Sequence, residues 1–272
     1  MNNNFKIKGH SGCKIEINDN LVTKTAKDAK YSDRLYLQMV KQNKFRHDNK
    51  YTGIKTSKVH DYGYVDENKF WFSMELIPYK TFDEFILLNG KSGLVRILDS
   101  IFNFIDNNIQ GMITVDSKIF TEKFEKTKKM IFNKHQIDFE WLNKVIYDLP
   151  AKMEIPKGYC HGDFTFSNML FGNDDIILID FLDTFLDSPL QDIVKLRQDT
   201  RYKWSLNFVS KVQDSIKVQQ ALSYIDKILC DKYNFVHYKE FQILNLLRII
   251  PYSYNKNHIN NLNREITNLC LH

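Results

Sequence analysis

The sequence predicts an α+β protein with two lobes, in which a small antiparallel sheet with one helix precedes a larger, mainly helical lobe. Short runs of alternating apolar and polar side chains fill about the first eighty residues, a pattern typical of half-buried strands. Pro78 then ends the strand run, because proline cannot donate a hydrogen bond to a sheet ladder. Beyond it, apolar side chains recur at helical spacing. We therefore expect lobes over residues 1–77 and 78–272, with the boundary at 76–80.

The small lobe is expected to begin as an antiparallel meander. Turn-forming residues at 9–12 and 18–20 separate its first runs, and a helical pattern that Ser32 or Asp33 can cap follows them. Asp61-Tyr62-Gly63 is typical of a turn, so the strand before it should stop early. The expected elements are strands at Phe5–Lys8, Lys14–Asn18 and Leu21–Ala26, a helix within Ser32–Lys44, a strand ending at Val59 and a strand at Phe70–Leu76.

The large lobe is expected to be helical except for one β-hairpin. Two short apolar runs, Asn168–Phe171 and Ile176–Phe181, flank Gly172-Asn173-Asp174-Asp175, a composition that favours a tight connection between strands. The expected helices are Thr81–Leu88, Gly93–Gln110, Thr121–Lys134, Phe139–Asp148, Trp204–Cys230, Tyr238–Ile250 and Ile259–Leu271.

The composition excludes several classes of protein. With 272 residues, 43% hydrophobic and 26% charged, the chain can bury a large core and is neither disordered nor fibrous. A net charge of +5 is only mildly basic, which disfavours a nucleic-acid partner. The 4 cysteines lie far apart, so no zinc ribbon or redox dithiol is expected. Without an apolar leader or a membrane-length apolar segment, we expect a soluble cytoplasmic protein with no membrane partner.

Polar residues that can carry chemistry surround the predicted hairpin. Asp163 precedes the hairpin in His161-Gly162-Asp163, Asn168 begins it, and Asp180 ends it. Because a hairpin folds back on itself, we expect Asn168 and Asp180 to lie close together, with Asp163 beside them. Carboxylate and amide oxygens are ligands that Mg²⁺ prefers in proteins, so this arrangement predicts a magnesium site.

This spacing of histidine, aspartate, asparagine and Asp-Phe resembles the catalytic and metal-binding loops of the protein-kinase-like fold. Glycine at position 162, where protein kinases have arginine, is similar to the aminoglycoside phosphotransferase and choline kinase family, which phosphorylates small molecules. Three earlier segments agree: Gly9–Gly12 resembles its phosphate-covering turn, Val22–Lys24 its third-strand lysine motif, and Met74–Pro78 its hinge. The resemblance spans residues 5 to about 200.

The resemblance implies an ATP- or GTP-dependent kinase that uses Mg²⁺. It assigns the proton-accepting role to Asp163, the metal to Asn168 and Asp180, nucleotide binding to Lys24, Ser11, Gly12 and the backbone near Glu75 and Ile77, and structural support of the site to His161 and Asp192. Lys27 and Lys30 compete with Lys24, but the alternating pattern of residues 21–24 selects Lys24 as the strand residue.

Two positions depart from the family pattern. Helix C of this family usually supplies a glutamate to pair with the strand lysine, and the equivalent register here offers Gln38. Because an amide cannot form the ion pair, Lys24 is expected to be held by Asp33, by phosphate alone, or less firmly. Leu182 replaces the glycine of Asp-Phe-Gly, which removes a flexible hinge but leaves the metal ligands in place.

The acceptor is expected to be a small molecule with a hydroxyl group. Only eleven residues separate Asp180 from Asp192, too few for the segment on which protein kinases place a peptide. From residue 201 onward the sequence has ten lysines and arginines against five acids, so a neutral or anionic acceptor, such as a sugar, is favoured over a cationic aminoglycoside. The alternatives are a nucleotide-binding protein without turnover, a choline or ethanolamine kinase with an aromatic cage, a protein kinase, and lastly a nucleic-acid binder.

Overall fold

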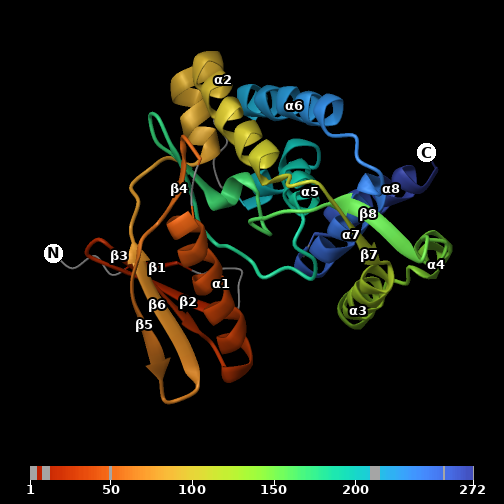
Figure 1. Cartoon of the computed structure of the whole chain (residues 1–272), viewed down its shortest axis with the longest axis horizontal. Helices are drawn as coiled ribbons and strands as arrows, with labels where there is room; N and C mark the ends of the chain where they lie inside the picture. Colours follow the sequence, from red (N-terminus) through yellow and green to blue (C-terminus); the bar gives the residue numbers. More distant parts are fainter. Residues whose placement is uncertain (1–4, 8–12, 49–50, 209–214, 254, 272) are drawn as a thin grey trace. The chain divides into compact units, whose positions relative to one another are not determined.

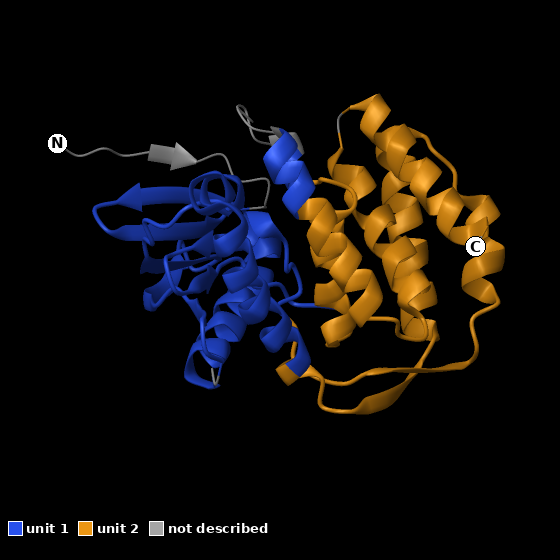
Figure 2. Ribbon diagram, turned by 90° about the horizontal axis from the view of Figure 1, so that it is seen from above, with its two compact units in different colours: residues 1–106, 161–184, 205–221 blue, residues 107–160, 185–204, 222–272 orange. Residues whose placement is uncertain are grey.

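The structure is a computed structural model, and it describes the chain except for residues 1–4, 8–12, 49–50, 209–214, 254 and 272 (Figure 1). The chain divides into two compact units (Figure 2). Unit 1 comprises residues 1–106, 161–184 and 205–221, and unit 2 comprises residues 107–160, 185–204 and 222–272.

Unit 1 contains a five-stranded antiparallel sheet with the strand order β1-β2-β3-β6-β5. Helix α1 (Ala29–Asp48) lies along this sheet in Figure 1 and shares a buried apolar cluster with it. Leu35 and Met39 of the helix meet Phe70 and Phe72 of the sheet in that cluster, and the burial of their apolar surface stabilises the unit. The strands are β1 (Phe5–Ile7), β2 (Cys13–Asn18), β3 (Leu21–Ala26), β5 (Val59–Val65) and β6 (Lys69–Glu75).

A second, three-stranded sheet of unit 1 carries the predicted hairpin. Its order is β4-β10-β9, where β10 (Ile176–Leu178) runs antiparallel to β9 (Met169–Phe171) and parallel to β4 (Ile54–Thr56). Helix α1 is bonded to β4 and to the residue after it, since the Arg46 guanidinium donates to the Thr56 carbonyl at 3.0 Å and the Gln42 amide donates to the Ser57 carbonyl at 2.9 Å. The early part of the chain is thereby connected to the hairpin.

The remaining described elements of unit 1 are mainly helical. Helix α2 (Phe82–Asn108) is interrupted at Gly90, whose φ of 56° and ψ of −145° are not helical. The interruption falls in the gap between the two helices expected at residues 81–88 and 93–110. The two 3₁₀ turns are η2 (Phe166–Asn168) and η3 (Ser205–Phe208).

Unit 2 is mainly helical and has its own apolar core. The aromatic rings of Phe120 and Phe241 meet edge to face in this core, with centroids 4.6 Å apart. Its elements are β7 (Met112–Asp116), α3 (Lys118–His135), η1 (Glu140–Leu142), α4 (Asn143–Tyr147), β8 (Lys152–Pro156), α5 (Pro189–Thr200), most of α6 (Ser215–Lys232), α7 (Tyr238–Ile249), η4 (Ile250–Tyr252) and α8 (Lys256–Leu271).

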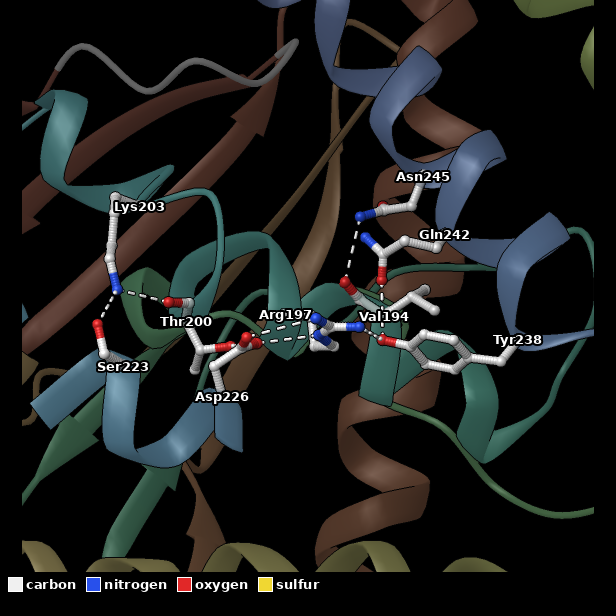
Figure 3. Close-up of polar contacts among 9 residues, drawn as sticks. All are labelled: Val194, Arg197, Thr200, Lys203, Ser223, Asp226, Tyr238, Gln242 and Asn245. Carbon is white, nitrogen blue, oxygen red and sulfur yellow. Dashed lines mark hydrogen bonds and ion pairs between the residues drawn. The ribbon is translucent and has the colours of Figure 1, made fainter. Parts of the chain in front are cut away.

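A polar network joins helices α5, α6 and α7 inside unit 2 (Figure 3). The Arg197 guanidinium donates to both carboxylate oxygens of Asp226, at 2.9 and 3.3 Å, and to the Tyr238 hydroxyl at 2.9 Å. The Thr200 hydroxyl also donates to Asp226, at 3.0 Å, and the Tyr238 hydroxyl donates to Gln242 at 2.9 Å. Each charged group is therefore compensated by several hydrogen bonds, as burial requires.

Some of the predicted element boundaries are wrong. The strand end expected at Val59 is instead the start of β5, which runs from Val59 through the expected turn at Asp61-Tyr62-Gly63 to Val65. Its register shifts between Val59 and Asp61, and an edge strand tolerates such a bulge at turn-forming residues. The antiparallel ribbon of β7 and β8 was not predicted at all. The expected helix over residues 204–230 is observed as η3 followed by α6.

The sheet with one helix in unit 1 and the helical unit 2 agree with the predicted α+β organisation. Unit 1 continues past the predicted boundary at 76–80, however, and includes most of α2 and the hairpin. The division into lobes at residue 77 stays a prediction. No helix in the described part of the chain combines the length and apolarity that a membrane crossing requires.

Candidate active site

The hairpin places Asn168 and Asp180 at the same end of the second sheet of unit 1. Met169 faces Leu178 in the ladder, and the amide of Ile179 donates to the carbonyl of Asn168 at 3.0 Å. Asp180 is the next residue. The strand register therefore explains why Asn168 and Asp180 were expected to lie close together.

Asn168 also holds the aspartate of the preceding loop. Its side-chain nitrogen donates to the backbone carbonyl and to Oδ2 of Asp163, both at 2.9 Å. These bonds use the amide nitrogen, which leaves the carbonyl oxygen as the Asn168 side-chain atom suited to a cation. Asp163 and Asn168 are both half-buried, so ligands can reach them.

Lys24 of β3 forms an ion pair with Asp180. Lys24 is buried, whereas the Asp180 side chain keeps 37% of its exposure. Burial lowers the pKa of the Lys24 ammonium to about 8. Neither Asp33, which is exposed, nor Gln38 supplies the charge opposite Lys24, so the partner expected from the sequence is corrected to Asp180.

The backbone around Asp180 is held in an uncommon conformation. Asp180 has a φ of 62°, in the left-handed region that non-glycine residues rarely adopt. Gly162 has a φ of 91°, and a Cβ placed on it would lie 2.6 Å from the Leu182 carbonyl oxygen. Position 162 therefore requires glycine here, which gives a physical reason for His-Gly-Asp in place of His-Arg-Asp.

His161 lies fully buried beneath the loop and bonds to backbone on both sides of its ring. Its Nε2 lies 2.9 Å from the Ile179 carbonyl oxygen, and its Nδ1 accepts from the Asp163 amide at 3.2 Å. Nε2 must therefore carry the proton of a neutral ring. Burial lowers the pKa of His161 to about 3, in agreement with that state. The arrangement suits a residue that orients the loop and does not transfer protons.

The nucleotide-binding predictions are only partly described by the structure. Ser11 and Gly12 lie outside the described residues. The Glu75 amide donates to the Lys58 carbonyl at 2.9 Å, and the Glu75 carbonyl accepts from the Ser57 hydroxyl at 2.6 Å, so both backbone groups already have partners. Among the described residues, the backbone groups of Ile77 form no hydrogen bond.

Asp192 lies in unit 2, in the first turn of α5, and is 1% exposed. Ser188 caps this helix, since its hydroxyl oxygen accepts from the Leu190 amide at 3.2 Å. The hydroxyl also donates to the Pro156 carbonyl of β8 at 2.7 Å. Because the Ser188 cap fixes the start of α5, it also fixes the position of Asp192 in the first turn.

The sequence reasoning missed two α1 residues that contact this region. The Lys41 ammonium donates to the Leu182 carbonyl at 2.8 Å. The Phe45 ring lies 5.2 Å from that of Phe181, centroid to centroid. Nothing in the local pattern marks a surface lysine as a backbone ligand, whereas the burial of Phe45 follows the helical apolar spacing.

The donor chemistry fits a magnesium ion that is bound together with a nucleotide. No cluster of three or more histidine, cysteine, aspartate or glutamate side chains occurs in the part of the chain that the structure describes, so the protein alone does not form a complete cage. Asp180 and Asn168 supply hard oxygen atoms, and Mg²⁺ is typically bound by one or two such groups together with phosphates and water.

Comparisons with known proteins agree with this geometry. The sequence model of the phosphotransferase enzyme family matches residues 123–217, which include the catalytic loop and the hairpin. The resemblance to the phosphotransferase enzyme family is confirmed. The predicted phosphotransferase class is confirmed with it. No curated protein sequence matches the chain.

Solved structures of phosphotransferases share the fold. An aminoglycoside 2′-phosphotransferase-IIIa variant with GDP has a TM-score of 0.61 at 12% identity, covering 98% of this chain and 91% of its own. An aminoglycoside phosphotransferase APH(4)-Ia variant with ADP and hygromycin B has a TM-score of 0.59 at 12% sequence identity. The match covers 98% of this chain and 92% of that enzyme. The amicoumacin kinase hAmiN, in complex with AMP-PNP, Ca²⁺ and Ami, has a TM-score of 0.56 at 12% sequence identity. The match covers 98% of this chain and 87% of hAmiN. The predicted kinase-like fold class is therefore confirmed.

Proposed function

We propose that this chain transfers the γ-phosphate of a nucleoside triphosphate to a hydroxyl group of a small molecule in a Mg²⁺-dependent reaction. The observation that carries the proposal is the convergence, within unit 1, of four residues singled out from the sequence. Lys24 pairs with Asp180, Asn168 bonds Asp163, and the Ile179 to Asn168 ladder bond joins the two pairs.

Phosphoryl transfer needs in-line placement and charge neutralisation more than covalent chemistry from the protein. Asp163 accepts the acceptor hydroxyl proton while the acceptor oxygen bonds to the γ-phosphorus and the bond to the β-phosphate oxygen breaks. Asn168 and Asp180 would hold Mg²⁺, which neutralises phosphate charge when it is bound. Lys24 binds the α- and β-phosphates in exchange for its contact with Asp180. His161 orients the loop through its backbone bonds.

The acceptor is proposed to be a neutral or anionic hydroxyl compound. Aminoglycosides are polycations, and the basic balance after residue 200 disfavours them. The structural neighbours include enzymes with aminoglycoside and amicoumacin ligands, so the test must include cationic compounds. A panel of sugars, sugar phosphates, amino alcohols, nucleosides and aminoglycosides, assayed for ADP release with ATP and for GDP release with GTP, separates these classes. Turnover only with the polycations would overturn this choice of acceptor.

The catalytic assignment is tested with matched carboxylate variants. Asp163→Ala serves as the blank, and Asp183→Ala, which removes an exposed carboxylate nearby in the sequence, serves as the control. We expect ADP release to disappear in the first and to persist in the second. Equal loss in both variants would contradict the role of Asp163.

The metal assignment has a separate test that does not require turnover. We expect Asp180→Asn to lose the Mg²⁺-dependent part of AMP-PNP binding, measured by calorimetry with and without the ion. An unchanged magnesium-nucleotide affinity would contradict the assignment. Metal-dependent binding without turnover on any acceptor would instead identify a nucleotide-binding protein.

A further inference from the structure

Helix α1 is linked to the chain on both sides of Asp180, through Thr56 on the earlier side and directly on the later side. On the earlier side, the Thr56 hydroxyl donates to the carbonyl of Leu178, two residues before Asp180, at 2.7 Å. Thr56 in turn accepts from Arg46 of α1 through its own carbonyl. On the later side, Lys41 of α1 donates directly to the carbonyl of Leu182, two residues after Asp180.

The peptide groups of Leu182 are fixed from two directions. Its amide donates to the His161 carbonyl at 3.0 Å, and its carbonyl accepts from Lys41 at 2.8 Å. The same carbonyl lies over Gly162, where a Cβ would approach it to 2.6 Å. Lys41, the catalytic loop and the segment after Asp180 therefore meet at one carbonyl oxygen, so a shift of one would displace the others.

Phe181, the residue between Asp180 and Leu182, is held by packing. Phe181 is buried, and its ring lies 4.3 Å from the His161 ring and 5.2 Å from the Phe45 ring of α1. Such packing can maintain the left-handed backbone of Asp180, which is strained in a non-glycine residue and persists only when its surroundings impose it.

We propose that Lys41 is a positioning residue that holds Asp180 in its metal-binding conformation, and that this contact takes over the coupling between helix and site that Gln38 cannot provide. The inference rests on the proposed function, because it assigns Asp180 to the metal. In this proposal Lys41 acts through the Leu182 carbonyl. Its positive charge also contributes, after burial, to keeping His161 neutral.

The test compares Lys41→Met with Lys44→Met, which removes an exposed lysine from the same helix. Loss of a charged hydrogen bond corresponds to about a tenfold to hundredfold effect. In Lys41→Met we expect hydrogen exchange at the amide of Leu182, which donates to the His161 carbonyl, to rise by about tenfold or more. The Mg²⁺ concentration that half-saturates AMP-PNP binding should rise similarly, whereas binding without Mg²⁺ should not change. Lys41→Arg should restore both.

The outcomes separate this proposal from the function on which it rests. Equal local exchange and equal Mg²⁺ dependence in Lys41→Met and Lys44→Met would overturn the positioning role. If Lys41→Met does not fold, Lys41→Gln carries the same comparison. Absence of Mg²⁺-dependent AMP-PNP binding in the natural sequence would overturn the proposed function, and the exchange measurement would still decide whether Lys41 fixes the Asp180 segment.

Discussion

The two units each contain a cation paired with an aspartate, and the two pairs differ in how completely they are bonded. In unit 2, Arg197 and Asp226 are 14% and 12% exposed and have further partners in Tyr238 and Thr200. In unit 1, Lys24 is buried while Asp180 keeps 37% of its side-chain exposure. Burial lowers the pKa of Arg197, whereas the contacts with Tyr238 and Asp226 raise it by more.

The difference indicates what each pair does. The bidentate pair in unit 2, whose two members are both bonded to further side chains, fixes three helices in one arrangement and has little freedom to bind a ligand. A single lysine contact to a half-exposed carboxylate can be exchanged, so the lysine can take a phosphate and the carboxylate a cation. The unit 2 pair is therefore expected to control stability, and the unit 1 pair to control binding and turnover.

The largest expected effect is on turnover in unit 1. Asp163→Asn keeps the shape of the side chain but removes the proton acceptor, so kcat should fall about 10²- to 10⁴-fold. The free energy of unfolding should change by less than about 1 kcal/mol, since the site is half-exposed. ADP-release kinetics and urea unfolding measure the two quantities. Asp183→Asn is the control, and a comparable kcat for both variants would contradict the assignment.

The corresponding change in unit 2 should act on stability. Arg197→Met leaves the Asp226 carboxylate buried without its cation, which typically costs about 3–5 kcal/mol. Urea unfolding should show this loss, and the double variant Arg197→Met with Asp226→Leu should recover part of it. A loss below about 1 kcal/mol in the single variant would remove the contrast between the pairs.

A pair of glycine variants sharpens the comparison at the backbone level. Gly162 and Gly111 have similar positive φ values, 91° and 99°, but a Cβ on Gly111 would meet nothing within 4 Å. Gly111→Ala should therefore cost only the conformational penalty of roughly 1–2 kcal/mol. Gly162→Ala adds a clash with Leu182 and should cost about 1–3 kcal/mol more. Equal unfolding free energies would show that the loop relaxes freely around position 162.

The smallest expected effect is a pH dependence from Lys24. Because its pKa is lowered to about 8, kcat/KM for the nucleotide should fall as the free enzyme loses this proton above about pH 8. Lys24→Arg should abolish this fall of kcat/KM above about pH 8. If the variant kept the same pH profile, the fall would belong to another titrating group. The lowered folded-state pKa also predicts a free energy of unfolding that rises between about pH 8 and 10.5, since the folded chain releases the proton first.

Local sequence patterns were sufficient to predict the hairpin and the loop that carries Asp163. The turn at residues 172–175 and the alternating strands of the first sheet are encoded by neighbouring residues, so their positions could be read directly. Ordinary strand register then brought Asn168 next to Asp180. The structural role that the family resemblance assigned to His161 agrees with the backbone bonds of its ring.

The features that were missed depend on pairing across long stretches of chain. Strand β8 alternates between buried and exposed residues, but its partner β7 is mostly exposed and lacks a distinct apolar pattern. The sequence of one strand therefore gave no indication that the other would pair with it. The pairing of Lys24 with Asp180 joins distant segments and was obscured by the expectation that α1 supplies the partner. Strand β5, which begins at Val59, was not expected, because its turn-forming tripeptide is also compatible with a bulged edge strand.

The parallel pairing of β4 with β10 also orders events during synthesis. In the part of the chain that the structure describes, β4 has β10 as its sole strand neighbour, and β10 leaves the ribosome more than a hundred residues later. The amino-terminal sheet can close on its own hairpins, but β4 must wait for this distant partner, a slow non-local step. A nascent chain can therefore complete the sheet that leads into Asn168 and Asp180 only after β10 has emerged.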